Sequence, residues 1–200
     1  MGRKRKGDPV HGWLIVDKPL GITSSAVVGR VRRLFNAAKA GHGGTLDPMA
    51  SGILPIAFGE ATKTVSYVMD GIKIYQFTVR WGESRTTDDG EGEINATSDV
   101  RPDEQSIKNA LNKFVGDIEQ VPPIYSAIKV DGKRAYDLAR NDIAVELQPR
   151  TIHIERFELI DMPDSDHATF EVVAGKGSYM RGLARDLALD LGTCGHISAL

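Results

Sequence analysis

Residues 41–55 read GHGGTLDPMASGILP, a glycine-rich stretch closed by prolines that holds one carboxylate, Asp47. Pro48 has no backbone N–H and disfavours helical angles at the residue before it, so Asp47 is expected in an extended conformation. The glycines carry no Cβ, which lets a ligand approach the main chain. Because Asp-Pro pairs also occur in ordinary surface turns, the choice between a turn and an active-site loop depends on the rest of the chain.

Strand and helix patterns flank this loop on both sides. Their mixture lacks strict βαβ alternation, which predicts an α+β fold with a mixed, largely antiparallel sheet flanked by helices. We expect a single domain over residues 1–200, with a basic, flexible tail at 1–9. The expected strands are 11–16, 54–58, 72–81, 126–130, 151–162 and 168–174, and the expected helices are 24–35, 60–70, 103–115, 133–140 and 178–191.

The composition indicates a folded chain with a core of useful size. Of the 200 residues, 41% are hydrophobic and 26% are charged. No run of about eighteen apolar residues occurs, and no apolar segment follows the basic N-terminus, so we expect neither a membrane span nor a signal peptide. The predicted location is the cytoplasm. Cys194 is the only cysteine, which excludes an intrachain disulfide and a cysteine-rich metal site.

The net charge of −2 hides a strong asymmetry along the chain. Through Leu46 there are nine basic residues and two acids, so this part carries +7 and the remainder −9. A basic segment that leads into the candidate loop is typical of enzymes that bind polyanions, because neutralised phosphates supply most sequence-independent affinity. For residues 3–6 alone, a solvated charged tail is the simpler interpretation.

Several common catalytic patterns are missing from the sequence. The glycine-rich loop lacks the Gly-Lys-Ser/Thr ending of a P-loop, and the three-glycine spacing of a dinucleotide site is also absent. The five histidines are scattered and offer no zinc-binding set. We therefore expect neither a bound metal nor a cofactor.

A lone aspartate can still act as a nucleophile at an electrophilic carbon, provided that a cation keeps it ionised. Arg181 is a candidate partner of Asp47, although for this residue alone a solvent-facing arginine that tolerates its position is the simpler interpretation. It lies in the first turn of its expected helix, where the macrodipole disfavours positive charge, and a residue placed against local preference often has another role. Tyr75 shares one face of its strand with Phe77 and Trp81, so it is expected to be half-buried.

Further stretches of the chain carry a family pattern. The pattern consists of residues 17–24 (DKPLGITS), 41–48 (GHGGTLDP), 51–55 (SGILP), 59–63 (GEATK), 121–140 (VPPIYSAIKVDGKRAYDLAR) and 176–181 (KGSYMR). In this order they resemble the motifs of the TruB family of tRNA pseudouridine synthases. Gly43 departs from the pattern, since many members have threonine there, and we expect this change to alter loop stiffness more than chemistry.

The resemblance implies the pseudouridine synthase catalytic fold and the isomerisation of uridine 55 in the TΨC arm of tRNA. It makes Asp47 the nucleophile, Arg181 the cation that holds its carboxylate, and Tyr75 the side chain that stacks on the target uracil. It implies tRNA as the partner, with no membrane and no obligate protein partner. The implied substrate-binding residues are His42, where the target base is flipped out, and Tyr179 and Leu200, which line the nucleotide pocket.

The implied reaction fits the residues. It breaks an N-glycosidic bond and forms a C-glycosidic bond without redox change, so no cofactor is required. Asp47 can attack the anomeric carbon of the sugar or add to the uracil ring, and the sequence leaves both routes open. Base flipping costs a few kcal/mol, which stacking on Tyr75 can offset.

Two rival functions are a non-catalytic RNA-binding module and an enzyme that cleaves free nucleosides. Intact Asp47, Tyr75 and Arg181 argue against a mere binder, and the basic leading segment favours a polyanionic substrate. Family members continue past the equivalent of Leu200 with a small C-terminal RNA-binding domain, which is absent from this chain. We therefore expect a truncated chain with a weaker hold on tRNA.

Overall fold

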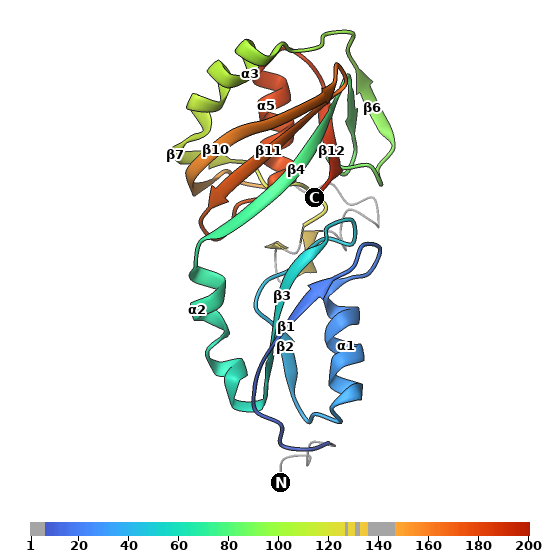
Figure 1. The fold of residues 1–200 in the computed structure, drawn as a ribbon, viewed down its shortest axis with the longest axis vertical. Coiled ribbons are helices and arrows are strands. Elements are labelled where there is room, and N and C mark those ends of the chain that lie inside the picture. The colour runs from blue at the N-terminus through green and yellow to red at the C-terminus, as the bar shows by residue number, and fades with distance from the viewer. Residues whose placement is uncertain (1–6, 127, 131–132, 136–146) are drawn as a thin grey trace. The chain divides into compact units, whose positions relative to one another are not determined.

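The structure is a computed structural model that describes residues 7–126, 128–130, 133–135 and 147–200 (Figure 1). The chain divides into two compact units, Met1–Gly71 and Ile72–Leu200, which are described in turn. Within the described ranges, no helix has both the length and the apolar character needed to cross a membrane.

The N-terminal unit is a three-stranded antiparallel sheet with the strand order β1-β3-β2 (Figure 1). Helix α1 packs on one face of it, where Val27 meets Leu54, Ile56 and Phe58 in a buried cluster. Thr23 caps the helix by accepting a hydrogen bond from the backbone N–H of Ala26. The elements are β1 (Gly12–Lys18), α1 (Ser24–Leu34), β2 (Ala40–His42), β3 (Gly52–Phe58), the 3-10 helix η1 (Gly59–Lys63) and α2 (Val65–Asp70).

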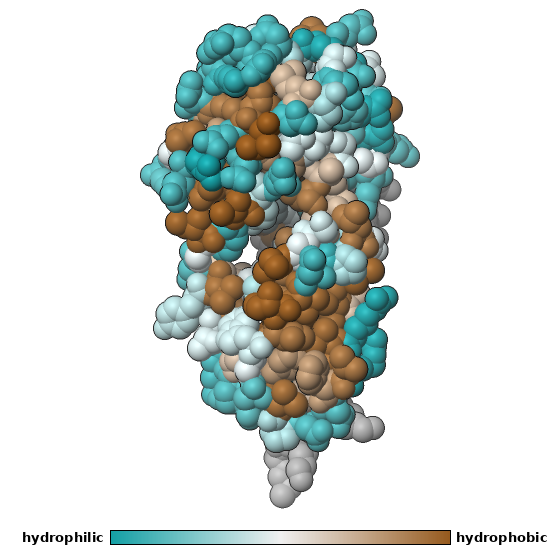
Figure 2. All heavy atoms as spheres, viewed as in Figure 1, coloured by the Kyte–Doolittle hydropathy of each residue, from teal (hydrophilic) through white to brown (hydrophobic). Residues whose placement is uncertain are grey.

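Strand β1 leaves one face of the sheet exposed. Trp13 is 39% exposed and Ile15 is 59% exposed, because α1 covers only the opposite face of the sheet. Ile53 on the neighbouring strand is also exposed, so apolar side chains extend over β1 and β3 (Figure 2).

The single helix expected at 60–70 is wrong. The segment divides at Thr64 into η1 and α2, and Met69 near the end of α2 is 47% exposed. The hydroxyls of Thr62 and Thr64 donate to the carbonyls of Gly59 and Ala61, three residues back in each case. These local bonds compete with the α-helical pattern and favour the tighter 3-10 turn.

The C-terminal unit contains a five-stranded antiparallel sheet in the order β12-β4-β11-β10-β7, and α3 and α5 lie against one face of it (Figure 1). This arrangement confirms the predicted α+β fold. The elements are β4 (Lys73–Trp81), β5 (Glu83–Arg85), β6 (Ile94–Thr97), α3 (Glu104–Leu111), η2 (Asn112–Phe114), β7 (Gly116–Gln120), β8 (Lys129–Val130), β9 (Lys133–Arg134), β10 (Arg150–Asp164), β11 (His167–Ala174), α5 (Met180–Asp190) and β12 (Gly195–Ala199).

The core of this unit follows the alternation predicted for β4. Phe77 and Trp81 are almost fully buried, and Phe170 lies 5.6 Å from Phe77 and 6.3 Å from Trp81 between ring centroids. Aromatic pairs of this kind contribute about 0.5–1.5 kcal/mol beyond the area that they bury. At Gly195 a Cβ atom would lie 2.9 Å from that of Ala188, so glycine is needed where α5 packs on β12.

Two expectations near the motifs need correction. The helix expected at 133–140 lies mostly outside the described residues, but Lys133 and Arg134, which would have begun it, form strand β9 instead and pair with β8. Helix α5 begins at Met180, two residues after its expected start, and the hydroxyl of Ser178 donates to the carbonyl of Gly175 at 3.1 Å. Tyr179 occupies the capping position and makes no side-chain capping bond.

Candidate active site

Asp47 lies in the connection between β2 and β3 of the N-terminal unit, and it is half-buried. Its carbonyl accepts a hydrogen bond of 3.0 Å from the N–H of Ala50, which closes a turn around Pro48. His42 ends β2 and pairs with Ile56 of β3, so it is fixed to the sheet at the start of the same connection. The sequence prediction of a presented carboxylate is consistent with this local geometry.

Ser24 anchors the residue immediately before Asp47. Its side chain is buried in the first turn of α1, and its hydroxyl both donates to the carbonyl of Leu46 and accepts from the N–H of Leu46, each at 2.9 Å. One hydroxyl therefore satisfies both backbone groups of Leu46. As a result, the helix start and the Asp47 loop are held together within the N-terminal unit.

Lys18 also lies in this region, although it was not predicted as a site residue. It is fully buried, and its ammonium donates to the carbonyls of Ile22 at 2.9 Å, Pro19 at 3.0 Å and Pro48 at 3.4 Å. Burial lowers the pKa of Lys18, and the nearby charge of Asp47 opposes that shift. A lysine placed directly before a proline at the end of a strand is the signal that could have found it.

Arg181 is nearly fully buried in the C-terminal unit, although it lies in the first turn of α5. Its guanidinium donates to the carbonyl of Thr87 at 2.9 Å and to that of Tyr125 at 2.8 Å. Arg181 thus lies where the helix macrodipole disfavours a positive charge, and these two carbonyls bind its guanidinium there.

Asp89 is a second functional candidate that sequence reasoning missed. Its carboxylate lies 3.4 Å from Arg181, and both side chains are 6% exposed. It also accepts from the hydroxyl of Thr87 at 2.5 Å and from the N–H of Glu91 at 3.0 Å. Because buried charges require partners, Asp89 balances the charge of Arg181 within this unit.

The other predicted site residues of this unit are Tyr75, Tyr179 and Leu200. They lie on β4, directly before α5 and directly after β12, in that order. Tyr75 pairs with Val172 across β4 and β11 and is half-buried, as predicted. The peptide groups of Tyr179 are held by the buried amide of Gln120, which accepts from its N–H at 2.9 Å and donates to its carbonyl at 3.0 Å. Leu200 directly follows β12 and is partly exposed.

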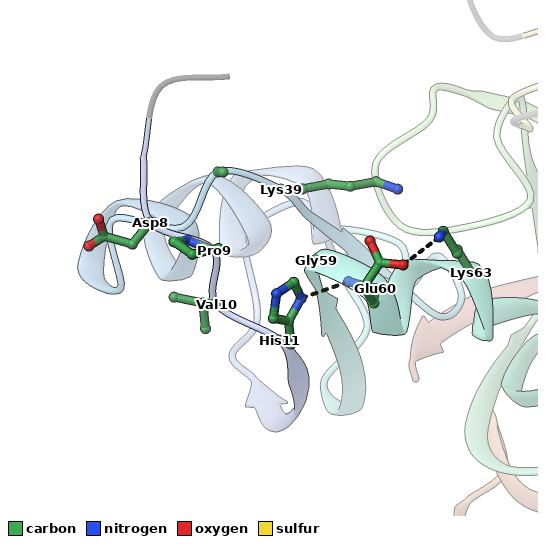
Figure 3. Close-up of a pocket in the computed structure, with 9 residues that line it drawn as sticks. Asp8, Pro9, Val10, His11, Lys39, Gly59, Glu60 and Lys63 are labelled. Atoms are coloured by element: carbon green, nitrogen blue, oxygen red, sulfur yellow. Dashed lines mark hydrogen bonds and ion pairs between the residues drawn. The ribbon is translucent and has the colours of Figure 1, made fainter. Parts of the chain in front are cut away.

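A hollow in the N-terminal unit does not include the predicted site residues (Figure 3). At its floor, His11 Nδ1 accepts a hydrogen bond of 3.0 Å from the N–H of Glu60, which in turn pairs with Lys63. Gly59 has a φ of +52°, and a Cβ there would lie 2.2 Å from the imidazole of His11, so the backbone approach requires glycine. Two lysines, Lys39 and Lys63, and two acids, Asp8 and Glu60, line the hollow, so its charges balance.

The fold resembles that of chains in solved structures of complexes that contain Cbf5. A chain in the crystal structure of a Cbf5-Nop10-Gar1 complex superposes with a TM-score of 0.71 at 27% identity, over 98% of this chain and 54% of that chain. This chain therefore shares the α+β fold of that chain.

The TruB family pseudouridylate synthase N-terminal domain model matches residues 32–180. The chain belongs to the TruB family. A relative from Rhodospirillum rubrum named tRNA pseudouridine synthase B is 64% identical over 200 residues, which are all of this chain and 65% of that protein. Another of that name, from Gluconacetobacter diazotrophicus, is 61% identical over 99% of this chain and 65% of its own length. The chain thus spans 65% of the length of each of these two relatives.

Proposed function

We propose that this chain is the catalytic domain of a tRNA pseudouridine synthase, which isomerises uridine 55 in the TΨC arm. The observation that carries the proposal is the 64% identity, over all 200 residues, to a relative named for that class of activity. The presented Asp47 and the buried Arg181 support it, since a non-catalytic RNA-binding module needs neither.

In the proposed reaction, the bond between uracil N1 and the sugar C1′ breaks, and a bond between C5 and C1′ forms. The C5 proton is released and N1 gains a proton, so atoms and electrons balance without an oxidant or a reductant. Asp47 is the nucleophile, acting at the sugar or at the uracil ring. Arg181 has the role that the family resemblance implies, which is to pair with the Asp47 carboxylate during the reaction.

The other predicted residues bind the flipped nucleotide in this proposal. Tyr75 stacks on the uracil and offsets part of the cost of unstacking. His42 contacts the RNA where the base leaves the helix. Tyr179, held by the amide of Gln120, and Leu200 line the nucleotide pocket.

Exposed arginines on α1 support the binding of a polyanion. Arg30, Arg32 and Arg33 are all exposed, and Arg32 also donates to the carbonyls of Ala37 and Ala38 just after the helix. Each phosphate that such a residue neutralises should lower the slope of log affinity against log salt by about 0.7–0.9. Changing both Arg30 and Arg33 to glutamine should therefore weaken tRNA binding and flatten its salt dependence.

Tritium release from a tRNA transcript labelled at uracil C5 tests the proposal. The chain should release tritium from the native transcript, and it should release none from a transcript with cytidine at position 55. Equal release from both transcripts would contradict the assigned position. Binding of tRNA without any release would favour the non-catalytic module.

A further inference from the structure

Two arginines on one side of α5 hold the same two segments of the C-terminal unit. Arg181 and Arg185 are four residues apart, so they lie on the same face of the helix. Arg181 donates to the carbonyls of Thr87 and Tyr125. Arg185 lies one helical turn further along and binds neighbouring residues of both segments.

The contacts of Arg185 connect three parts of the unit. Its guanidinium donates to the carboxylate of Asp88 at 3.1 Å and to the carbonyl of Val121 at 2.7 Å. Its Nε donates to Asp186 on the same helix at 2.9 Å. The side chains of Arg185 and Asp88 are only 24% and 14% exposed, and charge-assisted bonds are stronger where water is partly excluded.

The backbone at Asp88 needs such support. Its φ is +59°, a left-handed conformation that non-glycine residues rarely adopt and that costs about 1 kcal/mol or more. The carbonyl of Asp88 accepts from the N–H of Ile197, and the N–H of Gly90 donates to the carbonyl of Ile197, each at 3.1 Å. Burial raises the pKa of the Asp88 carboxyl, while Arg185 and Arg181 oppose that rise.

We propose that Asp88 and Arg185 are positioning residues for Arg181. By joining Asp88 to Val121, Arg185 fixes the spacing of the two segments whose carbonyls, at Thr87 and Tyr125, bind the Arg181 guanidinium. Because the guanidinium donors are planar and directional, a shift of either carbonyl turns the whole group. The catalytic consequence of this inference rests on the proposed function, whereas the positioning itself does not.

The catalytic test compares Arg185→Gln and Asp88→Asn with a matched control, Arg156→Gln. Arg156 pairs with Glu158 and Glu171 on the sheet and is 46% exposed. In the tritium assay, Arg185→Gln should lower kcat by about tenfold with KM for tRNA little changed. Asp88→Asn is nearly isosteric, and its amide oxygen still accepts a bond, so its loss should be smaller. The Arg156 variant should behave like the native chain.

A double variant distinguishes positioning from general stabilisation. If Arg185 acts through Arg181, then Arg185→Gln should cause little further loss of kcat in an Arg181→Lys background. A full, multiplicative loss in that background would overturn the proposal. So would a loss that appears only as a lower melting temperature.

Side-chain NMR of the 15N-arginine-labelled chain tests the positioning without any activity. The Nε–H signal of Arg181, assigned by its disappearance in Arg181→Lys, should shift and exchange faster with solvent in Arg185→Gln and should be unchanged in Arg156→Gln. An unchanged Arg181 signal in Arg185→Gln would refute the proposal. If the native chain releases no tritium, the proposed function fails, but this comparison still decides whether Arg185 positions Arg181.

Discussion

Ser24→Ala tests whether the start of α1 holds the candidate catalytic loop. The change removes two hydrogen bonds of 2.9 Å and leaves the N–H and carbonyl of Leu46 without the partner that the native hydroxyl supplies. Loss of a partner by a buried polar group costs about 1–3 kcal/mol. Alanine recovers up to about 0.5 kcal/mol through its higher helix propensity. We expect the free energy of unfolding to fall by about 1–2 kcal/mol.

Urea unfolding followed by circular dichroism measures this loss, and the tritium assay measures its effect on activity. Ser66→Ala is the control, because Ser66 is exposed in α2 of the same unit. Since Leu46 directly precedes Asp47, Ser24→Ala should also reduce kcat by about tenfold. A variant with native activity, and with a free energy of unfolding within about 0.5 kcal/mol of the native value, would refute the anchoring role.

Three further changes test other parts of the structure. Gln120→Leu removes both bonds to the Tyr179 backbone and should lower the free energy of unfolding by about 2 kcal/mol, measured in urea. Lys18→Met leaves three carbonyls without their donor and should cost about 2 kcal/mol or more by the same measurement. His196 is buried against the carbonyl of Glu83, and burial lowers its pKa, so the unfolded chain binds its proton more readily. The contribution of His196 to the free energy of unfolding should be complete above the ordinary histidine pKa of about 6.5 and should decline as pH falls below it. His196→Asn should reduce that decline, measured by comparing the free energy of unfolding at pH 7.5 with that at pH 5.5.

Local patterns predicted the elements whose burial follows a simple period. The alternation in β4 placed Phe77 and Trp81 in the core and Tyr75 half-buried, and the structure confirms each of these. The pattern at 60–70 was misleading, because two threonine hydroxyls bind carbonyls of the preceding turn and favour the 3-10 form. Such competition depends on individual side chains and is hidden from hydrophobic periodicity.

The residues that sequence reasoning missed owe their roles to distant contacts. Lys18 binds the carbonyl of Pro48, and Asp89 lies against Arg181, so neither environment exists until the chain has folded. Gln120 likewise acts on the backbone of Tyr179 from another strand. Asp47 could be selected from the sequence because the effects of the neighbouring glycines and proline on the backbone are local. Arg181 could be selected because the helix macrodipole acts within the first turn of the predicted helix.

The most direct test of the central claim is the rate of tritium release by Asp47→Asn. The variant should bind tRNA as the native chain does, yet its release should fall by at least about a thousandfold, as expected when a covalent nucleophile is lost. Asp99→Asn, which changes an exposed acid, should retain the native rate. Release by Asp47→Asn at the native rate would contradict the assignment of Asp47 as the nucleophile.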